Sequence, residues 1–251
     1  MSELYETLAP FYAAFNGDVG YERMATYVDR CFSAYFDGEV RDVLDLGCGS
    51  GNMTFPLLAL GYSMIGVDAS ESMLAAARDT RRGDEILWLC QDMRRFELYG
   101  TVEGVVSTLD CVNHLLSRKD VLSCFALVHN YLVPGGIFVF DINSPYKFKE
   151  IYGENCYVLE NENAFCVWQN FFDARRGRCH FSVDLFEEAD GGLYRRQSAD
   201  REEQMYSERQ IRTMLEQTGF TVLSVTDDYT DDAPSVTTER LTFVARANKE
   251  M

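Results

Sequence analysis

Residues 43–52 read Val43-Leu44-Asp45-Leu46-Gly47-Cys48-Gly49-Ser50-Gly51-Asn52, and this stretch decides the fold. An apolar run ends there in three glycines at alternate positions, and a helical pattern follows directly. Glycine accepts positive φ and lets a ligand approach the backbone closely. The N-terminus of the following helix offers unpaired N–H donors. Because open α/β sheets bind ligands at the carboxyl ends of their strands, the stretch predicts a ligand-binding loop after a first strand.

Short apolar runs alternate with helical stretches on either side of this loop. Strands are expected at residues 42–46, 63–67, 86–90, 104–107, 137–142, 220–226 and 241–245. Helices are expected near residues 52–60, 71–82 and 119–131, and from a capping box at 207–210 to residue 218. The turn Pro134-Gly135-Gly136 precedes the fifth strand. This order predicts an α/β fold with a Rossmann-like, seven-stranded, mostly parallel sheet and helices on both faces.

Two regions depart from this alternation. Residues 1–40 place apolar and aromatic side chains at helical spacing, with a break at residues 16–18, which predicts two helices that pack on the core. Residues 151–205 alternate as strands do, with hairpin-like breaks at residues 173–177 and 190–192. We therefore expect a three-stranded antiparallel β insertion after the fifth strand. The α/β core then comprises residues 41–150 and 206–251.

Charge and cysteine usage restrict the function. The chain has 251 residues, with 23 Lys+Arg against 40 Asp+Glu and a formal net charge of −17. A chain this acidic has no general attraction to nucleic acids or anionic membranes. Its eight cysteines include no CxxC pair, so no metal site is expected. Reduced thiols suit a cytoplasmic protein, and neither a signal peptide nor an apolar run of about 18 residues is present.

Acidic residues end the next two predicted strands. Asp68 is placed to accept hydrogen bonds from both hydroxyls of an adenine-linked ribose, with an N-cap or turn role before Ser70 as the alternative. Asp92 could accept from an adenine amino group while Met93 packs on the ring, although a strand-terminal Asp is often a turn residue. The fourth strand runs into a polar segment, residues 107–114, beside the reactive end of such a ligand.

Taken together, these motifs resemble the class I S-adenosylmethionine (SAM)-dependent methyltransferases. The motifs are VLDLGCGSG at 43–51, IGVDAS at 65–70, CQDM at 90–93, STLDCVNHL at 107–115 and LVPGGIFVFDIN at 132–143. The insertion, the segment LYETLAPFY at 4–12 and the tail DDAPSVTTERLTFVAR at 231–246 resemble the YqeM-like bacterial branch. That resemblance covers nearly the whole chain.

The resemblance implies a role for each matching position. The cofactor-binding residues would be Tyr12, Tyr21, Asp45, Gly47, Cys48, Gly49, Gly51, Asp68, Ala69, Asp92, Met93 and Leu109. The three glycines would cradle the methionine part of SAM, and Asp45 would lie near its amino group. Ala69 would lie beside the adenine, and Leu109 would line the sulfonium region. Tyr12 and Tyr21 would belong to an N-terminal helical lid, in which Met24 stands where relatives often have tryptophan.

Methyl transfer from SAM needs mainly alignment of nucleophile, methyl and sulfur, and a general base only if the nucleophile arrives protonated. Asp110 and His114 are the catalytic candidates by motif position, with structural roles as the alternative. The insertion would cover the acceptor site, where Arg195, Arg196 and Arg201 could meet an acidic acceptor or lie on a solvated strand face.

The expected activity is methyl transfer to a small-molecule N or O nucleophile, with S-adenosylhomocysteine as product, in a monomer or homodimer. Three alternatives stay open. The first is an RNA methyltransferase, and the second is a nicotinamide-dependent oxidoreductase, disfavoured because the loop reads GxGxG rather than GxGxxG. The third is a SAM-binding protein with little turnover.

Overall fold

The computed structural model describes residues 19–160, 164–189 and 191–249. Within these residues a seven-stranded sheet runs in the order β10-β11-β5-β4-β1-β2-β3. Its strands are β1 (Asp42–Leu46), β2 (Ser63–Asp68), β3 (Leu87–Cys90), β4 (Val102–Ser107), β5 (Leu132–Asn143), β10 (Phe220–Asp227) and β11 (Arg240–Ala247). The first five strands pair in parallel, whereas β11 runs antiparallel to both β5 and β10. The predicted Rossmann-like, mostly parallel sheet is confirmed.

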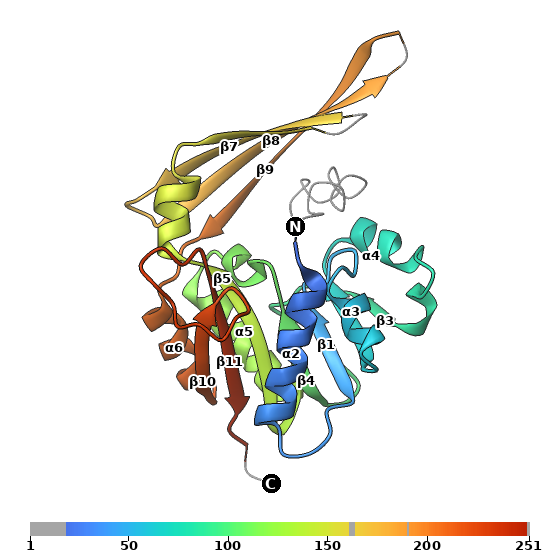
Figure 1. Cartoon of the computed structure of the whole chain (residues 1–251), viewed down its shortest axis with the longest axis vertical. Coiled ribbons are helices and arrows are strands. Elements are labelled where there is room, and N and C mark those ends of the chain that lie inside the picture. Colours follow the sequence, from blue (N-terminus) through green and yellow to red (C-terminus); the bar gives the residue numbers. More distant parts are fainter. Residues whose placement is uncertain (1–18, 161–163, 190, 250–251) are drawn as a thin grey trace.

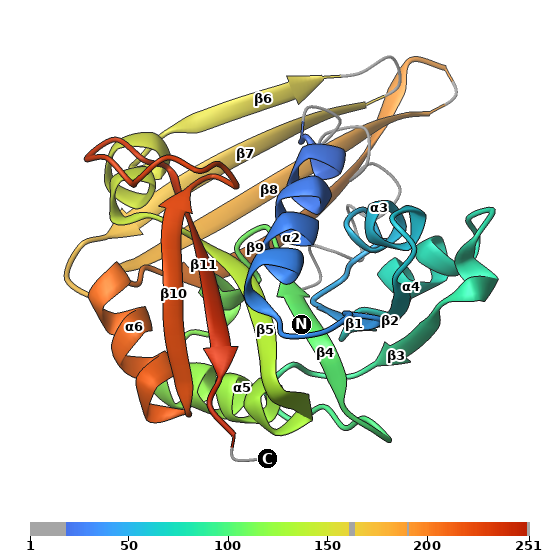
Figure 2. The ribbon, with the colours of Figure 1, turned by 60° about the horizontal axis from the view of Figure 1, so that its bottom comes forward.

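Helices cover both faces of this sheet (Figures 1 and 2). They are α2 (Tyr21–Tyr35), α3 (Thr54–Ala59), α4 (Glu71–Arg78), α5 (Arg118–Tyr131) and α6 (Glu208–Gln217). Successive strand residues point to opposite faces, so Val43 packs with α2, α3 and α4 while Leu44 packs with α5 and α6. Both side chains are fully buried. The near-continuous apolar runs of the predicted strands are explained by burial on both faces.

Local signals in the sequence fix several helix ends. Ser70 caps α4 by accepting a hydrogen bond from the Met73 N–H at 3.3 Å, and the Ser207–Gln210 capping box at the start of α6 is present. α4 ends at Arg78, four residues before the predicted end. A 3₁₀ turn, η1 (Gly83–Glu85), folds back on it there, and a Cβ at Gly83 would lie 2.3 Å from the Arg78 carbonyl oxygen.

The Pro134-Gly135-Gly136 turn lies inside β5 rather than before it. Leu132 pairs with Val102, and the next paired residue, Ile137, faces Gly104. The turn therefore bulges out of a strand that begins five residues earlier than predicted.

The insertion forms a second, antiparallel sheet, in the order β6-β7-β8-β9. Its strands are β6 (Cys156–Glu160), β7 (Ala164–Asp173), β8 (Arg178–Ala189) and β9 (Leu193–Gln204). The prediction of three strands was wrong, because β6 is a short edge strand whose side chains are mostly exposed and give no burial pattern. Figure 1 shows this sheet beyond one end of the seven-stranded sheet, connected to β5 through the π-helical turn η3 (Lys147–Tyr152).

Amide side chains attach the insertion to the core. Asn113, in the 3₁₀ turn η2 (Cys111–His114) after β4, donates from Nδ2 to the Gln204 carbonyl at 2.9 Å. Its Oδ1 accepts from the Asn143 N–H at 2.9 Å, at the end of β5. The end of β9 is thereby held against the carboxyl ends of β4 and β5. Among the described residues, no helix is long and apolar enough to span a membrane.

Candidate functional site

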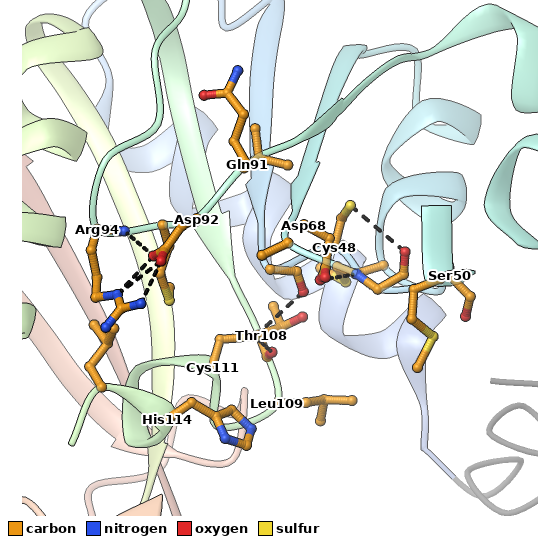
Figure 3. A pocket seen from close by; sticks show the side chains of 18 of the residues that line it. Cys48, Ser50, Asp68, Gln91, Asp92, Arg94, Thr108, Leu109, Cys111 and His114 are labelled. Atoms are coloured by element: carbon orange, nitrogen blue, oxygen red, sulfur yellow. Dashed lines mark hydrogen bonds and ion pairs between the residues drawn. The ribbon is translucent and has the colours of Figure 1, made fainter. Parts of the chain in front are cut away.

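A cavity of about 460 Å³ opens at the carboxyl ends of β1, β2, β3 and β4, and β9 contributes to its wall. The predicted residues that line it are Tyr21, Gly47, Cys48, Gly49, Asp68, Ala69, Asp92, Met93, Leu109 and His114. Figure 3 shows Asp68 and Cys48 on one side and Asp92 with Arg94 on the other, with Leu109 and His114 beyond Thr108. Loops that are far apart in the sequence therefore converge on one site, as the strand-end argument predicts.

The three glycines of the first loop adopt left-handed conformations, with φ of 83° at Gly47, 54° at Gly49 and 85° at Gly51. At Gly49 an added Cβ would meet nothing within 4 Å, so the missing side chain leaves space for a ligand. Gly51 does not line the cavity. A Cβ there would lie 2.7 Å from the Phe55 ring, which is a helix-packing constraint. Packing against Phe55 therefore requires a glycine at this position, and the contact of Gly51 with methionine stays a prediction.

Asp68 binds its own loop and still has free acceptor capacity. Its Oδ2 accepts from the Gly49 N–H at 2.9 Å, and its Oδ1 accepts from the Ser70 N–H at 2.8 Å. Each carboxylate oxygen can accept a second hydrogen bond. Burial raises the pKa of Asp68, and the backbone N–H donors counteract that rise. The carboxylate is thus fixed at the cavity wall with a second lone pair on each oxygen for a pair of hydroxyls.

Asp45 lies behind this wall rather than in it. Its side chain is buried, and its Oδ2 accepts from the Thr54 hydroxyl at 2.6 Å. Burial raises the pKa of Asp45 to about 7, and the charge of Asp68 adds to the rise. The Oδ1 atom is buried without a hydrogen-bond partner among the described residues. Asp45 is therefore set back from the cavity surface, and its place near the amino group of the ligand stays a prediction.

Asp92 lines the cavity but is already paired. Arg94 binds its carboxylate with two nitrogens, Nε at 2.9 Å and Nη2 at 2.5 Å. This pairing holds the pKa of Asp92 below its usual range. Met93 lines the same wall and packs on the main core. An adenine amino group at this wall would therefore meet a carboxylate that is already ion-paired with Arg94.

The segment after β4 is held in a strained turn. Leu109 and Asp110 are consecutive non-glycine residues with φ of 57° and 58°, a conformation that costs roughly 1–2 kcal/mol per residue. Asp141, fully buried at the end of β5, accepts from both of their N–H groups at 2.7 and 2.8 Å. It also accepts from the Tyr229 hydroxyl and from Arg240, each at 2.5 Å. These four bonds stabilise the turn that presents Leu109 to the cavity.

The two catalytic candidates differ in access. His114 lines the cavity, whereas the carboxylate of Asp110 lies 3.5 Å from Arg240 and does not. Burial alone would raise the pKa of Asp110, but the nearby cations Arg240 and Arg201 lower it below its usual value. Burial, and then the charge of Arg201, lower the pKa of His114 to about 4. A catalytic role for Asp110 stays a prediction, while His114 is neutral near pH 7 and lines the cavity.

Residues from the insertion complete this end of the cavity. Arg201 is buried, and its guanidinium carbon lies 4.9 Å from the ring centre of Trp168 and 4.8 Å from that of Phe181. Its Nη2 lies 2.9 Å from Oε1 of Glu203. Arg201 lines the cavity, whereas Arg195 and Arg196 are exposed, so the solvated strand face holds for those two and not for Arg201. Glu203 is fully buried and accepts from Asn143 Nδ2 at 3.1 Å. Burial raises the pKa of Glu203 to about 8, and the charge of Asp110 adds to the rise.

The N-terminal tyrosines can be placed in part. Tyr21, at the start of α2, lines the cavity near the Asn52 amide, which lies 3.4 Å from its hydroxyl. Burial raises the pKa of this phenol, so it is neutral. Tyr12 lies outside the described residues, and its role stays a prediction.

Residues 43–136 match a family whose description is "Methyltransferase domain". The chain carries a methyltransferase domain. It is 29% identical over 248 residues to YqeM of Bacillus subtilis (strain 168), named as a methyltransferase, with 98% of each chain covered. A SAM-dependent methyltransferase from Clostridium acetobutylicum ATCC 824 has 27% identity and a TM-score of 0.86, with 98% of this chain and 100% of that chain covered. The predicted resemblance is confirmed.

A third solved structure extends the likeness of fold. SAM-bound CalS10, an amino pentose methyltransferase from Micromonospora echinaspora, matches with a TM-score of 0.75 at 20% identity, over 95% of this chain and 97% of that one. The match spans both the methyltransferase domain and the region of the second sheet.

A metal ion does not suit the polar end of this methyltransferase domain. Ligand atoms of Asp110, His114 and Glu203 lie within 4.8 Å of one another. The two carboxyl groups already face cations, because Arg240 lies beside Asp110 and Arg201 beside Glu203. A divalent ion would add positive charge beside two buried guanidinium groups, those of Arg201 and Arg240.

Sequence reasoning missed four residues that shape the site: Arg94, Asp141, Glu203 and Arg240. Arg94 was visible two residues after Asp92, as a possible local partner. Asp141 lies within the quoted motif LVPGGIFVFDIN, where a carboxylate in an otherwise apolar strand marks a buried polar contact. Glu203 and Arg240 lie more than 90 residues along the chain from the Leu109–Asp110 turn, so no local pattern could reveal them.

Proposed function

We propose that the protein transfers a methyl group from SAM to a small-molecule N or O nucleophile and releases S-adenosylhomocysteine. The observation that carries the proposal is the cavity at the strand ends, where Gly49, Asp68 and Met93 offer an open cradle, a fixed carboxylate and an apolar wall. Those are the features that the methionine, ribose and adenine parts of SAM require. The 27% identity to a SAM-dependent methyltransferase over the whole fold supports the same reading.

The residues present fit this cofactor. Asp68 has one free lone-pair site on each carboxylate oxygen, as a ribose with two vicinal hydroxyls needs. The space beside Gly49 accepts the methionine chain. The unpartnered Oδ1 of Asp45, behind the loop, is an acceptor that an ordered water could connect to the amino group.

When bound, SAM supplies a methyl group already activated by positively charged sulfur. The chain then has to align the acceptor and exclude water. Asp141 fixes the Leu109 turn at the reactive end, and His114 offers a neutral imidazole there. A conjugate acid with a pKa near 4 is a weak base at neutral pH, so we assign His114 to shaping and hydrogen bonding within the first cavity rather than to general-base catalysis. An amine acceptor needs to arrive unprotonated.

Titration calorimetry with SAM and S-adenosylhomocysteine tests the proposal. We expect a 1:1 complex with either ligand and none with NADH. Failure to bind SAM or its product at millimolar concentration would refute the function. Tight NADH binding would instead favour the oxidoreductase alternative, and binding of SAM without turnover on any acceptor would favour a sensor.

Further features of the proposal follow from the sequence. We assign residues 1–40 to a lid, 41–150 and 206–251 to the catalytic core, and 151–205 to the cover of the acceptor site. The eight cysteines are all free, which supports a cytoplasmic location. The net charge of −17 supports a small molecule over RNA as the acceptor. A monomer or homodimer is expected, which sedimentation analysis would settle.

A further inference from the structure

A second cavity of about 520 Å³ shares one wall with the first. Leu109 lines both, so the two cavities adjoin at this residue, next to the space proposed for the sulfonium. The remaining walls come from the start of α2, from η3, and from the segment between β10 and β11. A methyl acceptor has to approach the methyl group from a space separate from that of SAM, and this cavity provides such a space.

Most charged groups around the second cavity neutralise one another. Arg23 pairs with Asp228 at 3.0 Å. Arg240 lies between three carboxylates, at 2.5 Å from Asp141, 3.5 Å from Asp110 and 3.6 Å from Asp228. Both arginines are therefore committed to the protein.

Lys147 differs from these arginines. It lines the cavity from the first position of η3, and its ammonium lies 5.4 Å from the ring centre of Tyr152. No carboxylate of the described residues lies within ion-pairing distance, 4.0 Å, of this ammonium. Burial and then the charge of Arg240 lower the pKa of Lys147, and the charges of Asp110, Glu239 and Glu203, all beyond ion-pairing distance, only partly oppose this fall. Such a group favours an incoming anion.

The acidic residues of the second cavity have partners or remain hydrated, so they do not require an incoming counter-ion. Asp227 accepts from the Thr238 hydroxyl at 2.8 Å, and Asp228 is held by Arg23. Glu239 is exposed and keeps its hydration. These acids nevertheless limit the charge that an anion can carry here, because a doubly charged phosphate would be repelled more strongly than a carboxylate.

We propose that the second cavity holds the methyl acceptor and that Lys147 binds a carboxylate of that acceptor. This inference rests on the proposed function, since it concerns the partner substrate of the same reaction. It narrows the acceptor class to small carboxylic acids that carry an amine or hydroxyl nucleophile. Lys147 would orient the acid end while the nucleophile faces Leu109.

The test compares each acid with its uncharged amide. The probes are the common amino acids and aromatic hydroxy acids, each beside its primary amide, with a phosphate monoester of matched size. Binding is measured by calorimetry on the full chain saturated with S-adenosylhomocysteine, and turnover by release of that product from SAM. We expect at least one acid to bind about tenfold to a hundredfold tighter than its amide, the range for a charge-assisted hydrogen bond.

Variants then assign the preference to one residue. Lys147→Met should remove the preference for the acid while leaving affinity for S-adenosylhomocysteine unchanged, and Lys147→Arg should retain most of it. Lys149→Met, on the exposed side of the same turn, is the matched control and should behave as the parent.

Three results would overturn the proposal: no acid preferred to its amide, equal losses for acid and amide in Lys147→Met, or preference for the phosphate ester. Each leaves SAM binding intact, so it is distinguishable from failure of the proposed function, in which SAM itself does not bind.

Discussion

Replacement of Asp68 by alanine tests the cofactor assignment most directly. The carboxylate uses one lone pair on each oxygen for the Gly49 and Ser70 N–H groups, at 2.9 and 2.8 Å, and leaves one on each for the ribose hydroxyls. Hydrogen bonds to a charged group are worth about 1.5–3 kcal/mol each. Loss of two amounts to about 3–6 kcal/mol, or roughly a hundredfold to 10⁴-fold in Kd. Because water can enter and hydrate the freed hydroxyls, we expect the lower end of this range.

The assay is calorimetric titration with S-adenosylhomocysteine and with its 2′,3′-dideoxy analogue. The parent should bind the analogue as weakly as Asp68→Ala binds the natural ligand, and the variant should not distinguish the two ligands. Asp84→Ala, at an exposed acid in η1, is the control for general charge loss. Unchanged affinity in Asp68→Ala would refute the ribose assignment. Additive losses from variant and analogue would show that the carboxylate acts through the loop instead.

Three further predictions concern stability and pH. Glu203 keeps its proton to about pH 8 in the folded protein but loses it near pH 4.5 when unfolded. Between these pH values the free energy of unfolding should therefore fall by up to about 1.4 kcal/mol per pH unit more in the parent than in Glu203→Gln. Urea unfolding at pH 5, 6.5 and 8 measures this, and a difference between the two proteins that does not change with pH would contradict it. Gly51→Ala should destabilise by about 1–3 kcal/mol in urea, because of its positive φ and its contact with Phe55, whereas Gly100→Ala, with open space and ordinary φ, should not. With the pKa of His114 near 4, the pH profile of kcat/KM should show no step near 6.5 that His114→Asn removes; such a step would mean that His114 titrates as an exposed imidazole.

The sequence predicted the sheet well because the relevant signals are local. Strands buried on both faces read as apolar runs, and the Ser70 and Ser207 caps fix helix starts within one turn. The errors arose where a strand lacks such a local signal. β6 is an exposed edge strand, and the glycine turn at 134–136 bulges within a continuing strand rather than ending it.

The site was predicted less completely, since strand-end positions do not specify partners. Leu109 was expected near the sulfonium, and it lines the cavity. The backbone of Leu109 is left-handed and is held by Asp141, which Arg240 in turn binds. This arrangement depends on the pairing of β5 with β11, which the sequence pattern does not show. Lys147 likewise gave no signal, because its importance lies in the absence of a nearby carboxylate among the described residues, which a linear pattern does not express.

The three acids that end neighbouring strands show why position alone cannot assign chemistry. Asp45 is buried behind the loop, and burial raises its pKa to about 7. Asp92 faces the cavity, but Arg94 occupies both of its oxygens and lowers its pKa. Asp68 is held by backbone N–H groups, which fix the carboxylate without adding a competing cation. A neutral diol is best bound by a fixed, charged acceptor whose remaining lone pairs face the ligand. We therefore propose the ribose role for Asp68 because of how its neighbours satisfy it, and replacement of Arg94 should affect adenine recognition without affecting that diol.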